Sequence, residues 1–109
     1  MGFCPVSYAL AFLDGKWKLR VIYVISKCEP IRFNELRRQV EGISNLMLSK
    51  THQELEDGGI VVRTQYNEVP PRVEYSLSEL GKGIYPVMDS LEQWGTMLYA
   101  FKERMDEEN

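Results

Sequence analysis

The segment 60–77 constrains the fold of this chain more than any other. In residues 60–66 and 73–77, β-branched and aromatic residues alternate with polar ones, which is the period-two pattern of half-buried strands. Pro70 and Pro71 stand between the two runs. They donate no backbone hydrogen bond and therefore belong in a loop. The segment predicts a long β-hairpin, with Arg72 beside its tip.

Two helices and a short strand are expected near the start of the chain. Pro5 follows Cys4, and proline is favoured at the first position of a helix. Residues 16–27 carry apolar side chains around much of the helical circumference, which predicts a buried central helix. Residues 31–32 are expected to add a short strand to the hairpin.

Two further helices precede the hairpin. Asn34 is expected to cap a helix over residues 34–40, and Ser44 a helix over residues 44–57. The turn between them contains Gly42. Two short helices joined in this way match the helix-turn-helix pattern, and the second becomes the candidate recognition helix. Followed by a hairpin with a basic tip, the pair predicts a winged helix-turn-helix.

The last helix is predicted over residues 78–105, where apolar residues recur at alternating spacings of four and three. Pro86 should kink this helix or end its first segment. Its C-terminal half, around residues 94–101, is interpreted as a subunit interface. The alternative is that the seam folds back on the first two helices, and the two arrangements can hold for different residues. The seam consists of Leu80, Ile84, Val87, Leu91, Trp94, Leu98, Phe101 and Met105.

Composition bounds the class of protein. A chain of 109 residues with 44% hydrophobic and 27% charged residues is expected to form one globular domain. No apolar run is long enough to span a bilayer, and no signal sequence is evident, so a cytoplasmic protein is expected, without membrane contact. Cys4 and Cys28 make neither a disulfide scaffold nor a zinc site. No cofactor or metal is expected.

The charge balance does not favour binding to nucleic acid. The net charge is −3 and the pI about 5.2, whereas a DNA-binding domain is expected to present a basic face. Four acidic residues gather in the tail after residue 102, and several arginines lie in the middle of the chain beside other acids. DNA binding therefore depends on how the fold sorts side chains by face.

The ordered set of motifs resembles the HxlR-type family of bacterial transcription regulators, relatives of the MarR-like winged helix proteins. The most specific match is the run EVPPRVEY at residues 68–75, and the matches cover almost the whole chain. The other matching pieces are Cys4-Pro5-Val6, Gly15-Lys16-Trp17, Arg32-Phe33-Asn34-Glu35-Leu36-Arg37-Arg38, Gly42-Ile43-Ser44, Met47-Leu48, Glu54-Leu55-Glu56, Leu80-Gly81 and Trp94-Gly95.

The resemblance implies a mainly α fold with a small β-hairpin wing (α+β), in one domain over residues 1–109. Its parts would be N-terminal helices at 4–28, a helix-turn-helix at 33–57, a wing at 60–77 and a C-terminal dimerisation helix at 78–105. It also implies a homodimer that binds a roughly palindromic operator in double-stranded DNA, with its terminal helices paired. The interface residues would be Val6, Leu10, Leu91, Trp94, Leu98 and Phe101.

Two positions depart from the family pattern. Position 46 is commonly basic or polar in the family and is Leu46 here, which puts one DNA contact in doubt. Position 52 is commonly leucine and is His52 here, the only histidine of the chain. We expect a partly buried structural histidine rather than a metal ligand or a base.

The candidate recognition helix leaves a polar face for the major groove. Asparagine and glutamine can pair with adenine, lysine favours guanine, and leucine can touch a thymine methyl group. The alternative is a solvated polar face, which is common on any surface helix. The candidate contacts are Ser44, Asn45, Leu46, Ser49, Lys50 and Gln53.

Arginines supply the candidate backbone contacts. Arg63 and Arg72 are expected on the wing, where they can reach phosphate or the minor groove. The alternative for Arg72 is an ion pair with the nearby Glu68 or Glu74, which would shape the loop. The remaining phosphate candidates flank the helix-turn-helix and are Arg32, Arg37 and Arg38.

Cys4 is the candidate for redox sensing. A thiol at a helix N-terminus has its thiolate favoured by the helix dipole. By resemblance, Cys4 would form a mixed or intersubunit disulfide that alters DNA affinity. The alternative is a helix-start residue without a sensing role. Cys28 is expected to be inert packing.

Three classes of function remain to be weighed. The leading hypothesis is a dimeric DNA-binding regulator whose effector, an oxidant or a small molecule, is unknown. The alternative is a winged-helix module that binds protein and not DNA, which the acidic pI favours. An enzyme is not expected, because the sequence has no phosphate loop, metal-ligand spacing or nucleophile–base set. A further hypothesis is a ligand pocket between the first helix, the last helix and their dimer mates, lined by residues such as Tyr8, Phe12, Tyr85 and Met88.

Overall fold

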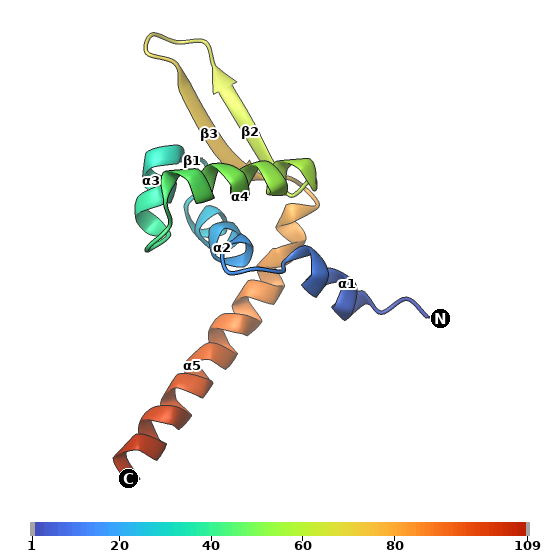
Figure 1. Ribbon diagram of the computed structural model, residues 1–109, viewed down its shortest axis with the longest axis vertical. Helices are drawn as coiled ribbons and strands as arrows, with labels where there is room; N and C mark the ends of the chain where they lie inside the picture. Colours follow the sequence, from blue (N-terminus) through green and yellow to red (C-terminus); the bar gives the residue numbers. More distant parts are fainter. Residues whose placement is uncertain (1, 109) are drawn as a thin grey trace.

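The computed structural model describes residues 2–108; residues 1 and 109, the ends of the predicted domain, lie outside this part. Helices dominate, and one small sheet projects from them (Figure 1). In chain order the elements are α1 (Pro5–Phe12), α2 (Lys18–Cys28), β1 (Ile31–Arg32), α3 (Phe33–Gln39), α4 (Asn45–Asp57), β2 (Val61–Tyr66), β3 (Arg72–Leu77), the 3-10 helix η1 (Gly81–Ile84) and α5 (Tyr85–Glu108).

The sheet confirms the predicted hairpin and the predicted short strand. Its order is β1-β3-β2, and both pairings are antiparallel. Tyr75 of the central strand β3 lies opposite Ile31 of β1 and Arg63 of β2. Because alternate side chains point to opposite faces of a strand, Tyr75 and Leu77 share one face, and both are buried. The far end of the β2–β3 hairpin extends beyond the helices as a wing (Figure 1).

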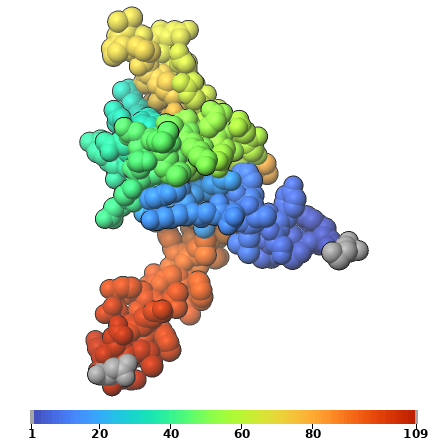
Figure 2. Space-filling model, viewed as in Figure 1, coloured from blue at the N-terminus to red at the C-terminus, as the bar shows by residue number. Residues whose placement is uncertain are grey.

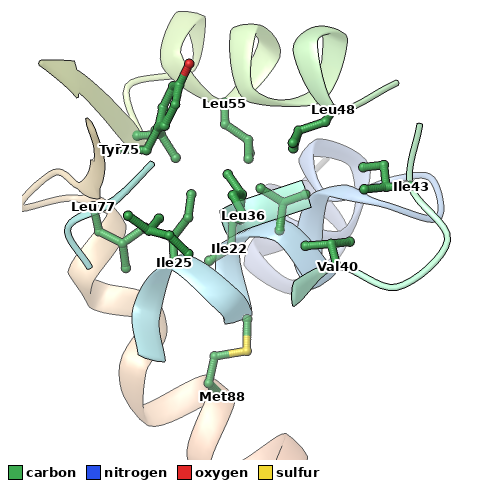
Figure 3. Close-up of a cluster of buried hydrophobic side chains, with 13 residues drawn as sticks. Ile22, Ile25, Leu36, Val40, Ile43, Leu48, Leu55, Tyr75, Leu77 and Met88 are labelled. Atoms are coloured by element: carbon green, nitrogen blue, oxygen red, sulfur yellow. The ribbon is translucent and has the colours of Figure 1, made fainter. Parts of the chain in front are cut away.

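The hydrophobic core forms between α2, the helix-turn-helix and the base of the sheet (Figure 3). The prediction of a buried central helix is confirmed, because α2 contributes Val21, Ile22 and Ile25 to the core. Cys28, at the end of the same helix, is exposed, so its predicted packing role is wrong. The other core residues are Ile31, Leu36, Val40, Ile43, Leu48, Leu55, Val61, Tyr75, Leu77 and Met88.

One helix cap is confirmed and one is wrong. The Ser44 hydroxyl oxygen accepts a hydrogen bond from the Met47 amide at 3.0 Å and caps α4. Asn34 does not cap α3, which begins at Phe33 with Arg32 as its N-cap residue and no side-chain capping bond. The reason is that β1 runs directly into α3, and pairing of Arg32 with Glu74 of β3 holds the chain extended up to the helix.

Of the two alternatives for Pro86, a kink or the end of a first helical segment, the structure shows the second. The 3-10 helix η1 ends at Ile84, and α5 begins at Tyr85, so Pro86 occupies the first turn of α5. A proline is tolerated there because its missing N–H would have no partner within the helix. The chain changes from a 3-10 to an α-helix at this point and is not kinked within a continuous helix.

The first turns of α5 are fastened to the end of α2. Glu29 accepts a hydrogen bond from the Leu77 amide at 3.1 Å and another from the Tyr85 hydroxyl. Lys27 Nζ lies 3.0 Å from a carboxylate oxygen of Glu92. Tyr23 and Lys27 hold the pKa of Glu92 below its ordinary value, by hydrogen bonding to the carboxylate.

Beyond this attachment, α5 leaves the body of the molecule (Figures 1 and 2). Trp94 is 59% exposed and Phe101 51% exposed, so the C-terminal half of the seam does not fold back on α1 and α2. Met88 is the α5 residue that joins the core. Among the described residues, no helix has the length and apolar character needed to cross a membrane.

Two glycines of η1 provide a matched test of packing at the base of the sheet. A Cβ atom at Gly81 would lie 2.3 Å from the carbonyl oxygen of Ile60, whereas one at Gly83 would meet nothing within 4 Å. We expect Gly81→Ala to lower the free energy of unfolding by about 1–3 kcal/mol, because the backbone must move. Gly83→Ala should change it by no more than about 0.5 kcal/mol. Urea denaturation measures both, and equal stabilities would contradict this packing.

Candidate nucleic-acid interface

Helix α4 separates an apolar face from a polar one. Its inner face packs Leu48 and Leu55 in the core, and the buried Thr51 hydroxyl donates to the Met47 carbonyl at 2.7 Å. The outer face lies across the front of the body in the view of Figure 2. All of the predicted groove contacts are exposed on this helix or at its N-cap: Ser44, Asn45, Leu46, Ser49, Lys50 and Gln53.

Three of these residues carry particular constraints. Leu46 is 83% exposed, so its side chain is accessible to a thymine methyl group in the major groove. The Ser44 oxygen is occupied by the helix cap, but the hydroxyl hydrogen can still be donated. The Gln53 amide donates to Asp57 at 3.0 Å, so Gln53 must exchange this bond to pair with a base.

Arg72 is held within the wing. Its guanidinium lies 3.3 Å from a carboxylate oxygen of Glu68 and 3.7 Å from one of Glu74. It also stacks over the Tyr66 ring, 4.1 Å from the ring centroid. The alternative of an ion pair is therefore confirmed with both acids. Sequence reasoning missed the Tyr66 platform, although the hairpin register that makes Tyr66 and Arg72 opposite residues could have indicated it.

The other arginines differ in whether an acidic side chain pairs with their charge. Arg38 pairs with Glu35, and the Gln39 amide and the Arg38 guanidinium hold the pKa of Glu35 below its ordinary value. Arg32, Arg37 and Arg63 are exposed, and none of the three forms an ion pair within residues 2–108. Their charges remain available to an anionic partner.

Cys4 is exposed and is the N-cap residue of α1, without a side-chain capping bond. The pKa of its thiol is lowered, chiefly by the Ser7 side chain and then by the backbone amides of Ser7 and Val6. These are the first groups of the helix that Cys4 precedes, so the predicted preference for the thiolate has a local cause. Both cysteines are free.

The predicted effector pocket needs the helices of a second protomer, so it stays a prediction. Tyr8 is 71% exposed on α1, while Met88 lies in the core. Phe12 instead helps to line an apolar cavity of about 330 Å³ between α1, α2 and η1. The structure therefore offers a hollow in this region, but with a different lining: Ala9, Phe12, Leu13, Ile22, Ile60, Leu80, Gly81, Gly83 and Ile84.

Comparison with known proteins identifies relatives along most of the chain. The HxlR-like helix-turn-helix family matches residues 12–103. An uncharacterized HTH-type transcriptional regulator of Halalkalibacterium halodurans is 43% identical over 91 residues, which cover 84% of this chain and 80% of the relative.

Solved structures show the same fold. The redox regulator HypR in its reduced form matches with a TM-score of 0.83 and 39% identity, over 93% of this chain and 99% of that one. A protein of Porphyromonas gingivalis W83, described as a MarR-family transcriptional regulator, matches with a TM-score of 0.81 and 40% identity, over 88% and 93% of the two chains.

These comparisons agree with the geometry of α3, α4 and the wing. The relatives are transcriptional regulators, which are not enzymes, and this confirms the expectation that the chain is not an enzyme. The predicted winged helix-turn-helix fold and the resemblance to HxlR-type regulators are likewise confirmed. The chain belongs to the HxlR-like helix-turn-helix family of transcriptional regulators.

Proposed function

We propose that this protein is a cytoplasmic, sequence-specific DNA-binding regulator that acts as a homodimer on a palindromic operator. The observation that carries the proposal is the exposed polar face of α4, fixed at its start by the Ser44 cap and flanked by a projecting wing (Figure 1). Side chains on such a helix read base edges in the major groove. Arg32, Arg37 and Arg63 would contact phosphates, which position the protein on the duplex.

The distribution of charge supports DNA binding in spite of the acidic pI. The tail acids Glu103, Asp106, Glu107 and Glu108 lie at the far end of α5, and the wing projects from the opposite end of the molecule (Figure 1). Exposed charges more than about 10 Å apart are largely screened at physiological salt. The tail therefore adds to the net negative charge without opposing DNA at α4.

The dimer is proposed from the apolar surface of the terminal helices. Val6 and Leu10 on α1 are exposed, as are Leu91, Trp94, Leu98 and Phe101 on α5. Exposed apolar residues along a helix mark an interaction site, and the heptad-like spacing on α5 suits a second helix. In such a dimer, two α4 helices would lie about 34–36 Å apart, one turn of DNA.

Regulation through Cys4 is the further part of this proposal. Cys4 is exposed and its thiolate is favoured, which are the properties of a reactive thiol. HypR, a relative of the same fold, is named as a redox regulator with reduced and oxidized forms. Two Cys4 thiols, one from each protomer, would lose two protons and two electrons to an oxidant to form an intersubunit disulfide. A mixed disulfide with a small thiol is the other product.

A second candidate function, binding of a protein partner by the winged helix, is favoured by the net charge of −3. It differs from the first in the response to salt. Binding to phosphates must weaken steeply as salt increases, because counterions are released. Failure to bind any of a pool of random duplexes at low salt would favour the protein partner.

The reading face is tested with a double variant. We expect Asn45→Ala with Gln53→Ala to lose about 1–3 kcal/mol of discrimination for each base pair that these side chains contact. Selection of sites from random duplexes identifies the operator, and titration of matched and mismatched duplexes measures the loss. Gln93→Ala, an exposed glutamine on α5, is the control and should bind as wild type. Full selectivity in the double variant would assign base reading to other residues.

The dimer is tested by placing a charge in the seam. We expect Leu98→Glu to shift the protein from dimer to monomer, because two carboxylates would be buried in the apolar interface. Thr96→Glu, about 200° around the helix from Leu98, should leave the dimer intact. Sedimentation equilibrium over a range of concentrations measures the mass. A dimer of unchanged stability in the Leu98 variant would locate the interface elsewhere.

The redox proposal is tested with matched cysteine variants. Diamide should change the operator affinity of the wild type and of Cys28→Ser, and should leave Cys4→Ser unaffected. The disulfide should appear as a covalent dimer on non-reducing electrophoresis and disappear with dithiothreitol. A Cys4→Ser variant that responds like wild type would exclude Cys4 as the sensor.

A further inference from the structure

Three lysines gather beside the recognition helix, at the start of α2. A hollow of about 250 Å³ lies between α4 and the segment that joins α1 to α2. Lys16 of that segment, Lys18 at the start of α2 and Lys50 of α4 all line it. We call these three residues the lysine cluster. Lys50 is already a candidate groove contact, whereas the motif that contains Lys16, at residues 15–17, has no role in the proposed function so far.

The ring of Trp17 ties this segment to the helix-turn-helix. A Cβ atom at Gly42, in the turn between α3 and α4, would lie 3.9 Å from Cη2 of Trp17. The Arg20 guanidinium donates to the Glu41 carbonyl in the same turn at 2.9 Å, and its central carbon lies 4.8 Å from the centroid of the Trp17 ring. Lys16 Nζ lies 4.7 Å from that centroid. Lys16 is therefore held close to the turn that precedes α4.

The charge of Lys16 is not consumed within the protein. Lys18 Nζ lies 3.5 Å from a carboxylate oxygen of Glu54, so the acid that α4 contributes to the hollow is already paired. Lys16 and Lys50 are exposed, and neither forms an ion pair within residues 2–108. The other acid of the lining is Asp14, so cations outnumber acids in the hollow. Its surface favours an anionic partner.

The lysine cluster and the wing lie on opposite sides of α4. Lys50 is on the edge of α4 that faces the hollow. The buried His52 is about 200° further around the helix, and its ring contacts that of Tyr75 on β3, with centroids 4.8 Å apart. Leu46 and Ser49 are on the exposed face between these two edges. Figure 2 shows the same order, with the wing (yellow) above α4 (green) and the start of α2 (blue) below it.

We propose that Lys16 is a phosphate-binding residue that contacts the DNA backbone on the side of the major groove opposite the wing. This inference rests on the proposed DNA-binding function and extends the interface to the segment before α2. A helix in the major groove lies between two phosphate backbones, so elements on both of its sides come close to phosphates. The Trp17 ring holds the Lys16 ammonium beside α4 before DNA arrives, which lowers the entropy lost on binding.

A phosphate contact has a signature in the salt dependence of binding. Each lysine that neutralises a phosphate of duplex DNA contributes about 0.9 to the slope of log affinity against log salt. Removal of one contact should therefore make the loss of affinity between about 50 and 200 mM salt about 3.5-fold smaller. A phosphate contact carries no sequence information, so the ratio of operator to random-duplex affinity should not change.

The experiment compares two lysine-to-glutamine variants of the full-length protein. Lys16→Gln should bind the operator and a scrambled duplex more weakly by the same factor, with the less steep salt slope. Lys82→Gln removes an exposed lysine of η1 that pairs with Glu79; it is the matched control for lost charge and should keep the wild-type slope. Lys16→Arg should restore the slope, because it keeps the charge. Affinities are measured by titration at several salt concentrations.

The outcomes separate this inference from the function on which it rests. Equal slopes for Lys16→Gln and Lys82→Gln would overturn the phosphate contact and leave the DNA-binding proposal intact. A lower melting temperature of Lys16→Gln with an unchanged slope would also overturn it, and would assign Lys16 to packing on Trp17. Lys16→Met, which keeps an apolar stem over the ring, replaces Lys16→Gln if that variant does not fold. Absence of binding by wild type to any duplex at low salt would overturn both proposals.

Discussion

The pairing of β3 on both of its edges is the constraint on which the rest of the structure depends. On one side, β3 holds the two residues of β1 extended up to the first turn of α3. On the other, it forms the wing with β2. Its buried face carries Tyr75 and Leu77 into the core against α2 and α4. A single strand thus sets the start of the helix-turn-helix, the direction of the wing and one wall of the core. As a result, α4 presents a polar face to solvent while α2 stays buried behind it, and a DNA-reading helix requires such an exposed face.

Local patterns in the sequence were sufficient for much of this fold. The alternation in residues 60–66 and 73–77 predicted the hairpin, because alternate side chains of a half-buried strand face the core. Ser44 predicted the start of α4, because its cap is a hydrogen bond to a residue three positions along the chain. The failures involve distant partners. Asn34 has the chemistry of a cap, but the pairing of β1 with β3 determines where α3 begins. Cys28 follows three buried residues of α2 and is nevertheless exposed. The apolar pattern of the helix does not show at which residue the neighbouring elements stop packing against it.

The candidate site was predictable to a similar extent. Helical periodicity sufficed to sort the exposed residues of α4 from the buried ones. The surroundings of Arg72 were predicted in part: two acids close in sequence indicated ion pairs, whereas the stacking on Tyr66 depends on the register of the hairpin. Contacts of His52 with Tyr75 join residues 23 positions apart, and no local pattern reports them. What the side chains of α4 touch in a complex depends on the DNA, which lies outside the information in one chain.

The attachment of α5 has a mechanical consequence. Its 24 residues make a rod about 36 Å long at about 1.5 Å per residue, and the rod is fastened near its first turns by Met88 in the core and by the contacts of Glu29 and Lys27. Such an element behaves as a lever whose fulcrum is the end of α2. A tilt of about 5° there displaces the far end by about 3 Å over that length. Small rearrangements among a few polar side chains are therefore amplified into shifts comparable to the rise of one base pair.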